Sequence, residues 1–182
     1  GDGSISDKAL AQIRREHNLG AWSVYAGLYG TPEQVELNWK MVSGAFKSIG
    51  GEVLTEAELG DNPVFQYRSA LMRGDMTLSE FGLYNWRGGG GSSWFAPVSQ
   101  ARGSETLKQM KMAQDILGEF GFDYVAECVV GWRDMHHIID LLFDRTDSAE
   151  RDRAKACFDK LLDEFSKHGY GSYRTNTAYM KK

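Results

Sequence analysis

Residues 122–143, FDYVAECVVGWRDMHHIIDLLF, determine the predicted fold. Within them, residues 122–130 and 135–143 are apolar runs rich in β-branched and aromatic side chains, which predicts two strands. On either side, residues 103–118 and 148–168 carry apolar side chains at helical spacing, so each segment is predicted to be a helix. The sequence therefore predicts an α+β fold, a largely antiparallel sheet covered by helices on one face.

A strand–helix–strand passage is also predicted in the N-terminal half of the chain. Thr31 is a favourable N-cap and Pro32 suits the first helical position, so a helix is expected to begin there and to end at Gly50. Residues 57–92 contain no long periodic segment, and a connection of that length is expected to carry function or to pack on something outside the chain. The remaining predicted elements are strands at residues 21–29, 52–55 and 93–98 and a helix from residue 6 to about residue 20.

The composition is that of an ordinary globular protein of 182 residues, with 42% hydrophobic and 12% aromatic side chains. The net charge of −4 argues against a nucleic-acid-binding protein, which needs a basic surface. Two cysteines are too few for a disulfide scaffold, and no apolar run reaches the roughly 20 residues that span a bilayer. The chain begins without Met and ends on Lys181-Lys182, so both ends are expected to be cut from a longer chain, with a processed or tagged protein as the alternative.

Four consecutive glycines at residues 88–91 lie between Trp86 and Trp94. Their backbone amides could cradle a phosphate, but the run lacks the Lys and Ser/Thr of a P-loop and does not begin a helix. A flexible loop, or backbone that passes close to a flat ligand, is the favoured interpretation. The two tryptophans would suit a planar aromatic ligand, and ordinary core tryptophans are the alternative.

Ionisable side chains lie within the predicted strands. His136 and Asp140 share one strand face about 13 Å apart, so they can line one cavity without touching. His136 and His137 point to opposite faces, and without a His-x-x-x-His or Cys-x-x-Cys pattern a zinc site is rejected. Glu127 lies in an apolar strand, where a carboxylate must be paired, protonated, functional or on an exposed face. Glu80 is a similar but weaker case.

Tyr173 and Arg174 follow the last predicted helix and lie among small residues. A phenol donor beside a guanidinium fork can bind one oxyanion. Ordinary surface-loop chemistry is the alternative, and the pattern alone favours it.

Several segments together resemble one family. They are LYGTPE, GGGSSWFAPV, ARGSE, GFDYVAE, RDMHHIIDLLFDRT and GYGSYRTN, in this order along the chain. They resemble the substrate (cap) domain of the vanillyl-alcohol oxidase family of FAD enzymes, in its p-cresol methylhydroxylase branch. The resemblance covers essentially the whole chain. It implies a cap domain at residues 1–168, a segment at 169–182 that returns toward the FAD-binding domain, and an FAD-binding domain that this chain lacks.

The resemblance implies part of an FAD-dependent oxidoreductase of para-alkylphenols such as p-cresol, 4-ethylphenol or eugenol-like compounds. In that family the phenol is bound as phenolate, a hydride leaves the benzylic carbon for the flavin, and water adds to the quinone methide that remains. Such an enzyme, a 4-alkylphenol dehydrogenase (hydroxylating) or an oxidase, would be active only together with the FAD-binding domain.

The resemblance also implies roles for individual residues. Tyr173 and Arg174 would hold the phenolate oxygen, where a fixed cation lowers the free-energy cost of the anion. Trp94 matches an aromatic wall of the substrate pocket. Carboxylate and imidazole groups around the benzylic carbon and the flavin can activate or orient the attacking water. The residues at those positions are Glu80, Glu127, His136 and Asp140.

Gly90, Gly91 and Ser92 are implied to lie against the flavin. The family attaches FAD covalently through a Tyr just before the glycine run or through a His at the position of Ser92, so attachment at Ser92 is not expected. The Tyr position falls on Tyr84 or on Arg87, depending on the alignment register. Tyr84 would give covalent FAD, whereas Arg87 would leave FAD non-covalent or attached elsewhere.

The implied partners are a phenolic substrate, the FAD-binding domain and a c-type cytochrome as electron acceptor, with O₂ as the alternative acceptor. The resemblance further implies a homodimer or heterotetramer and a location in the bacterial periplasm, with the cytoplasm as the alternative. No metal, nucleic acid or membrane span is expected. The competing hypothesis is a non-catalytic α+β ligand-binding or interaction domain. It would bind through the surface formed by Trp86, Trp94 and the glycine run at residues 88–91.

Overall fold

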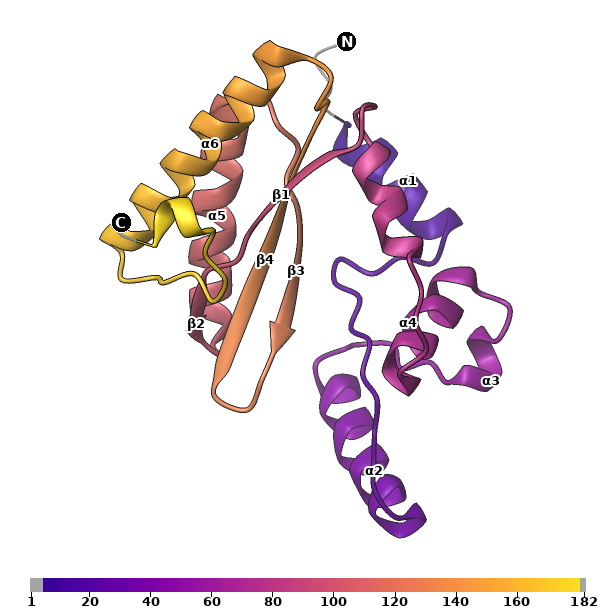
Figure 1. The fold of residues 1–182 in the computed structure, drawn as a ribbon. Helices are drawn as coiled ribbons and strands as arrows, with labels where there is room; N and C mark the ends of the chain where they lie inside the picture. The colour runs from indigo at the N-terminus through magenta and orange to yellow at the C-terminus, as the bar shows by residue number, and fades with distance from the viewer. Residues whose placement is uncertain (1–4, 181–182) are drawn as a thin grey trace. The chain divides into compact units, whose positions relative to one another are not determined.

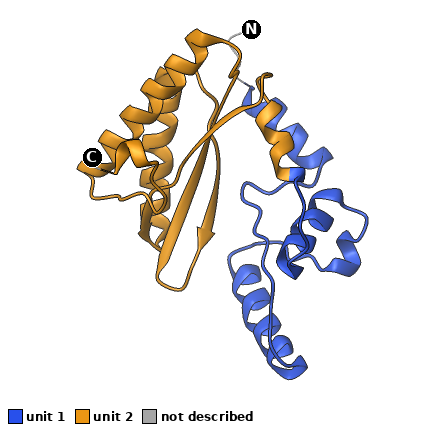
Figure 2. Ribbon diagram, in the orientation of Figure 1, with its two compact units in different colours: residues 1–79 blue, residues 80–182 orange. Residues whose placement is uncertain are grey.

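The computed structural model describes residues 5–180 and divides the chain into two compact units, residues 1–79 and residues 80–182 (Figures 1 and 2). The division predicted after residue 168 concerns the path toward a domain outside this chain, and it stays a prediction.

The first unit is helical, with α1 (Asp7–Glu16), α2 (Pro32–Ser48), α3 (Glu56–Leu59) and α4 (Pro63–Arg73). The start of α2 is as predicted, because the Thr31 hydroxyl accepts a 3.4 Å hydrogen bond from the amide of Gln34. Its end is also as predicted, since Gly50 follows it in the left-handed region, at φ 79°. The predicted first helix is α1, which ends several residues earlier than expected.

The predicted strands at residues 21–29 and 52–55 are wrong, because neither segment is a strand in the described chain. Tyr29 uses its hydroxyl to donate to the carbonyl of Met72 at 2.7 Å. Thr55 precedes α3, and its amide donates to the Glu58 carboxylate at 2.7 Å. Aromatic and β-branched side chains favour a strand only where a neighbouring strand completes the backbone hydrogen bonds.

Residues 57–92 contain the helix α4, so the prediction that they hold no long periodic segment is wrong. Asn62 Oδ1 accepts hydrogen bonds from the amides of Val64 and Phe65, each at 3.0 Å. Pro63 follows at the first helical position, and Gly74 ends the helix at φ 88°. This cap is a sequence signal that periodicity alone does not register.

The second unit is built on a sheet of β1 (Gly91–Phe95), β2 (Val98–Gln100), β3 (Val125–Val130) and β4 (Asp134–Phe143). All three other strands pair antiparallel with β4: β1 and β2 follow one another along one edge, and β3 lies along the other. The single strand predicted at residues 93–98 is divided into β1 and β2 at Pro97, which has no backbone N–H to donate to the ladder.

Helices α5 (Gly103–Glu119) and α6 (Ser148–Lys167) cover one face of this sheet (Figure 1). A short 3₁₀ helix, η1 (Ser79–Asn85), precedes β1, and a second one, η2 (Thr177–Tyr179), follows α6. The predicted α+β fold is therefore confirmed. The core between sheet and helices includes Phe95, Ala113, Leu117, Ile139, Leu141, Cys157, Leu161 and Phe165. Within it, the rings of Phe95 and Phe165 meet edge to face with centroids 5.0 Å apart.

Candidate functional site

The predicted site residues of the strands lie on the face of the sheet that α5 and α6 leave uncovered. The β4 side chains that point into the helix-covered core are Met135, His137, Ile139 and Leu141, each 2% exposed or less. Because strand side chains alternate, the opposite face carries His136, Ile138, Asp140 and Leu142. Register adds the neighbouring strands to that face: Trp94 lies opposite Asp140, and Glu127 lies opposite Ile138. The shared face predicted for His136 and Asp140 is present.

Asp140 is a buried carboxylate on this face, only 5% exposed. The Ser92 hydroxyl donates to Asp140 Oδ1 at 2.6 Å, and Trp94 Nε1 donates to Ser92 Oγ at 2.8 Å. Asp140 Oδ2 is buried and has no hydrogen-bond partner in the described chain. Burial raises the pKa of Asp140, its hydrogen bond with Ser92 lowers it, and the charge of Glu80 raises it. The sheet therefore fixes one carboxyl oxygen and leaves the other without a partner.

Tyr84 and Glu80 approach the same end of the face from η1. The rings of Tyr84 and Trp94 meet edge to face with centroids 6.4 Å apart. Burial and the charge of Asp140 raise the pKa of Tyr84, so its phenol keeps its proton at neutral pH. The half-buried Glu80 acts through its charge on both Tyr84 and Asp140. One cluster therefore unites Glu80, Tyr84, Ser92, Trp94 and Asp140.

Tyr173 and Arg174 lie at the other end of the face, beside His136. The ring of Tyr173 stacks on the imidazole of His136 with centroids 4.6 Å apart and planes 18° apart. The guanidinium of Arg174 lies over the Tyr173 ring, 5.6 Å from its centroid. The backbone holds this segment in place, because the Tyr173 amide donates to the Ala96 carbonyl at 3.1 Å. His136 Nε2 also lies 2.8 Å from a carboxylate oxygen of Asp134.

The two ends of the face are about 13 Å apart, since His136 and Asp140 are four residues apart on one strand. The half-buried Glu127 lies between them across the strand pair, opposite Ile138. One end therefore offers a guanidinium and a phenol to an anion, and the other end offers a buried carboxyl group. An elongated aromatic molecule with a phenolate at one end would match this order of groups.

The glycine run adopts a conformation that only glycine tolerates well, with Gly88, Gly89 and Gly90 all in the left-handed region at φ 79°, 63° and 67°. A Cβ on Gly89 would lie 1.8 Å from Asp144 Oδ1, and one on Gly91 would lie 2.3 Å from the Phe143 carbonyl oxygen. Contacts within the chain therefore account for the glycines at residues 89 and 91. The flavin-binding role of Gly90, Gly91 and Ser92 stays a prediction.

His137 points to the opposite face from His136, as strand alternation predicts. It is fully buried, and its Nε2 lies 2.7 Å from the hydroxyl of Tyr124. Burial lowers the pKa of His137 to about 4 and raises that of Tyr124 to about 12. Both groups are therefore neutral at pH 7 and belong to the core beneath the site.

Glu150 is a residue that the sequence does not predict for the site: it is a buried carboxylate at the start of α6 that pairs with Arg87 just before the glycine run. The family resemblance offers Arg87 only as an alignment alternative to Tyr84. An acidic residue in the first turn of a helix is ordinary, so no local signal marks Glu150 as a partner of a residue 63 positions earlier.

Other kinds of site are not evident in the described part of the chain. Among residues 5–180 no group of three or more His, Cys, Asp or Glu side chains is arranged to hold a metal ion. None of the helices in this range is both long and apolar enough to cross a membrane. A polar hollow in the first unit, lined by residues that include Glu56, Gln66 and Arg73, contains none of the predicted site residues.

Comparisons with known proteins define the class: the chain corresponds to the C-terminal cap region of flavoproteins of the vanillyl-alcohol oxidase type. One curated relative is the flavoprotein subunit of 4-cresol dehydrogenase (hydroxylating) from Pseudomonas putida. The chain is 55% identical to it over 181 residues, which is 99% of this chain and 35% of that subunit. The predicted family resemblance is therefore confirmed.

Two solved structures have the same fold. The structure of p-cresol methylhydroxylase with substrate bound matches 96% of this chain and 34% of its own, with a TM-score of 0.89 and 56% identity. The isoeugenol complex of 4-ethylphenol oxidase from Gulosibacter chungangensis matches 97% of this chain and 35% of its own, with a TM-score of 0.88 and 28% identity. No family model matches the chain. The chain spans about a third of the length of these relatives.

Proposed function

We propose that this chain is the substrate-binding cap of an FAD-dependent enzyme that oxidises para-alkylphenols. The observation that carries the proposal is the order of groups on the uncovered face of the sheet. Tyr173 and Arg174 lie at one end, Glu127 lies between, and the buried Asp140 lies at the other end. The 55% identity to the 4-cresol dehydrogenase flavoprotein subunit over nearly the whole chain supports the same substrate class.

FAD is a cofactor that these residues fit. Asp140 Oδ2 is buried and unpartnered on a surface that also carries the Tyr84 and Trp94 rings, as expected where a further polar and aromatic group completes the site. Tyr84 would contact it from η1, Gly90 from the end of the loop that precedes β1, and Gly91 and Ser92 from the start of β1. When bound, the flavin supplies the acceptor for the hydride that leaves the benzylic carbon.

The residues at the anion end bind and orient the substrate. The Arg174 cation and the Tyr173 hydroxyl would take the phenolic oxygen and stabilise its anion, which raises the electron density that expels the hydride. The stack of Tyr173 on His136 keeps the phenol ring of Tyr173 in a fixed orientation. This fixed geometry lowers the reorganisation needed when charge develops.

The residues at the end of the face that carries the Asp140 carboxyl group would bind and transfer protons and orient water. Because the Ser92 hydroxyl donates to Asp140 Oδ1, a proton on this carboxyl group resides on Oδ2. A raised pKa lets Asp140 exchange that proton closer to neutral pH than an exposed aspartate does. Glu127 and His136 would orient the water that adds to the quinone methide. The net change is a 4-alkylphenol and water to a 4-(hydroxyalkyl)phenol, two electrons and two protons.

We further propose a c-type cytochrome as the electron acceptor and a periplasmic location, since the relative with 55% identity is a hydroxylating dehydrogenase. Stopped-flow mixing of the reduced full-length protein with air-saturated buffer distinguishes the two acceptors. Slow reoxidation supports the cytochrome, and fast reoxidation supports an oxidase.

The direct test of the proposed function is turnover of p-cresol in ¹⁸O-labelled water by the full-length protein that contains this chain, with an artificial electron acceptor. The proposal expects 4-hydroxybenzyl alcohol that carries one ¹⁸O atom from water. A protein that binds phenols without oxidising them would instead support the non-catalytic binding domain.

A further inference from the structure

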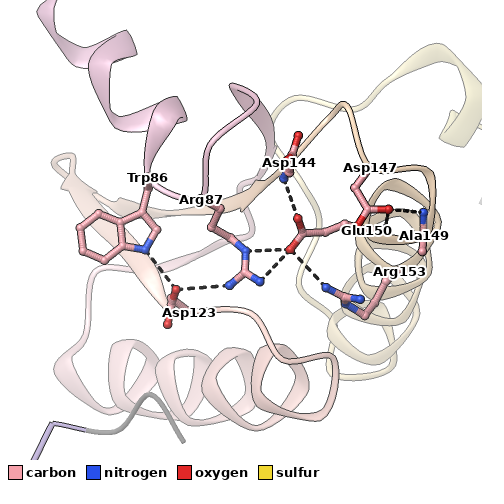
Figure 3. A network of polar contacts seen from close by, with 8 residues as sticks. All are labelled: Trp86, Arg87, Asp123, Asp144, Asp147, Ala149, Glu150 and Arg153. Carbon is pink, nitrogen blue, oxygen red and sulfur yellow. Dashed lines mark hydrogen bonds and ion pairs between the residues drawn. The ribbon is translucent and has the colours of Figure 1, made fainter. Parts of the chain in front are cut away.

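A polar network holds the segment between η1 and β1 against the start of α6 (Figure 3). Arg87 Nε and Nη2 both contact Glu150 Oε1, at 2.8 and 2.7 Å. Arg87 Nη1 lies 3.6 Å from Asp123 Oδ2, which also accepts a 3.1 Å hydrogen bond from Trp86 Nε1. Two neighbouring side chains at the end of η1 are therefore fixed by partners from α6 and from the segment that leads into β3.

Glu150 is the centre of the network because its carboxylate joins three segments (Figure 3). Oε1 accepts from Arg87 and also from Arg153 Nη2 at 3.1 Å, within α6. Oε2 accepts from the backbone amide of Asp144 at 2.9 Å, just beyond the end of β4. The side chain of Glu150 is only 9% exposed, and its partners are two guanidinium groups and a backbone amide, so its hydrogen bonds are of the stronger kind.

Both guanidinium groups also contact an aromatic ring. Arg87 and Arg153 lie over the ring of Phe122, with their central carbons 5.4 and 5.2 Å from its centroid. Phe122 is 5% exposed and belongs to the core. The network therefore packs against the hydrophobic core. Because the local dielectric constant is lower there than in water, both the ion pairs and the cation–π contacts are stronger.

The same loop also passes close to Asp144. Gly89 lies so close to Asp144 that a Cβ would meet Asp144 Oδ1 at 1.8 Å. Asp144 is itself held by Glu150 through its backbone amide. Residues 86–91 are thus held at Arg87 by the Glu150 carboxylate, and at Gly89 they lie against Asp144, whose amide Glu150 accepts from.

The residues on either side of this loop are the ones that converge on Asp140. Tyr84 precedes Arg87 by three residues and Ser92 follows it by five, and both belong to the cluster around Asp140. We propose that the Arg87–Glu150 ion pair positions Tyr84 and Ser92 around Asp140 and thereby determines the geometry of the flavin-binding end of the site. This inference rests on the proposed function and assigns the pair a part in it.

The test uses Glu150→Gln in the full-length protein, loaded with FAD and studied well below its thermal midpoint. Asp115→Asn is the matched control, because Asp115 forms an exposed ion pair with Lys111 on α5. The first readout is backbone hydrogen exchange in peptides that span residues 80–92. The second is the pair of kinetic constants kcat and KM for p-cresol. The third is the fraction of flavin that resists acid extraction. Arg87→Lys keeps the cation but loses the two-nitrogen contact, and it serves if Glu150→Gln does not fold.

The proposal expects exchange in residues 80–92 to rise roughly 10-fold in Glu150→Gln while β3 exchanges as in the wild type. It also expects kcat or the acid-resistant flavin fraction to fall roughly 10-fold with little change in KM, and Asp115→Asn to match the wild type. Unchanged exchange, or faster exchange with wild-type kinetics and flavin attachment, would overturn the positioning role. A wild-type protein without flavin or phenol oxidation would contradict the proposed function instead, and the exchange data would still decide whether the pair orders residues 80–92.

Discussion

The hydroxyl of Ser92 donates a 2.6 Å hydrogen bond to Asp140 Oδ1, across a sequence separation of 48 residues. The donor is on β1 and the acceptor on β4, and Ser92 is in turn held by Trp94. The carboxyl group is therefore oriented by the rigid sheet, and its buried second oxygen has no hydrogen-bond partner in the described chain.

Asp140→Asn should raise the thermal stability at pH 7 and lower the turnover of p-cresol. The folded protein raises the pKa of Asp140 above its ordinary 3.8, so wild-type stability falls as the pH rises through the window above that value. A neutral amide of the same shape avoids this loss, so the variant should gain thermal stability over the wild type at pH 7 and none below pH 3.8. Turnover of p-cresol should fall by about 10- to 1,000-fold, because the proton on Oδ2 is no longer available.

Melting curves at both pH values and steady-state kinetics measure the two effects in one variant. A variant that is less stable than the wild type at pH 7, or equally active, would contradict the account of a buried functional carboxyl group.

Arg174→Ala should remove most of the stabilisation of the phenolate. Loss of one positioned donor from an anion site costs about 2.7–4 kcal/mol in the transition state, or about 100- to 1,000-fold in kcat/KM. Arg133→Ala is the control, because Arg133 is exposed near the turn between β3 and β4. Near-normal kcat/KM in Arg174→Ala would exclude the assigned role.

Tyr84→Phe tests the attachment of the flavin. Tyr84 lies beside Trp94 and Asp140, at the end of the site where we propose that the flavin binds. If Tyr84 carries the covalent link, flavin fluorescence should remain with the wild-type protein on a denaturing gel and should be lost from the variant. Tyr25→Phe, in the other unit, should behave as the wild type does. A wild-type protein that already releases its flavin in acid would rule out the link.

His137→Gln should change acid stability. Because burial lowers the pKa of His137 to about 4 from 6.5, its contribution to stability is complete above pH 6.5 and is lost as the pH falls through 4. At 1.36 kcal/mol per pH unit, the loss amounts to roughly 3 kcal/mol. Glutamine stays neutral and can still bond to Tyr124, so the variant should lose less stability between pH 6.5 and 4. The free energy of unfolding is measured against pH for both proteins, and an equal loss between pH 6.5 and 4 would refute this.

Gly89→Ala should destabilise the second unit by about 2 kcal/mol or more, since the methyl group meets Asp144 Oδ1 and the residue has φ 63°. Gly118→Ala is the matched control: this glycine lies in α5 with nothing near its Cβ position, so alanine should stabilise the helix by about 0.5–1 kcal/mol. The thermal midpoints of the two variants should move in opposite directions, and a shift of both in the same direction would argue against the loop conformation.

Elements with local signals were predictable from the sequence. The cap at Thr31 and the apolar stripes of α5 and α6 depend on residues within a few positions of one another, and these helices formed as expected. The segment at residues 21–29 has strand-like side chains but no partner strand, and partnership is not encoded locally.

The site shows the same limit. Alternation along one strand placed His136 and Asp140 on one face from the sequence alone. The hydrogen bond from Ser92 to Asp140 needs the register of β1 against β4, and the pairing of Arg87 with Glu150 needs the packing of α6. Those relationships join segments 48 and 63 residues apart, which no spacing rule connects.

The proposed role of this chain, as the cap of an FAD enzyme that oxidises para-alkylphenols, requires that the substrate reduces the flavin. It is tested most directly by anaerobic mixing of the full-length protein with p-cresol in a stopped-flow spectrometer. We expect a flavin absorption band that bleaches in one turnover, at a rate that saturates with p-cresol and that Arg174→Ala slows by about 100-fold or more. A flavin band that p-cresol leaves unchanged, or a purified protein without flavin, would contradict it.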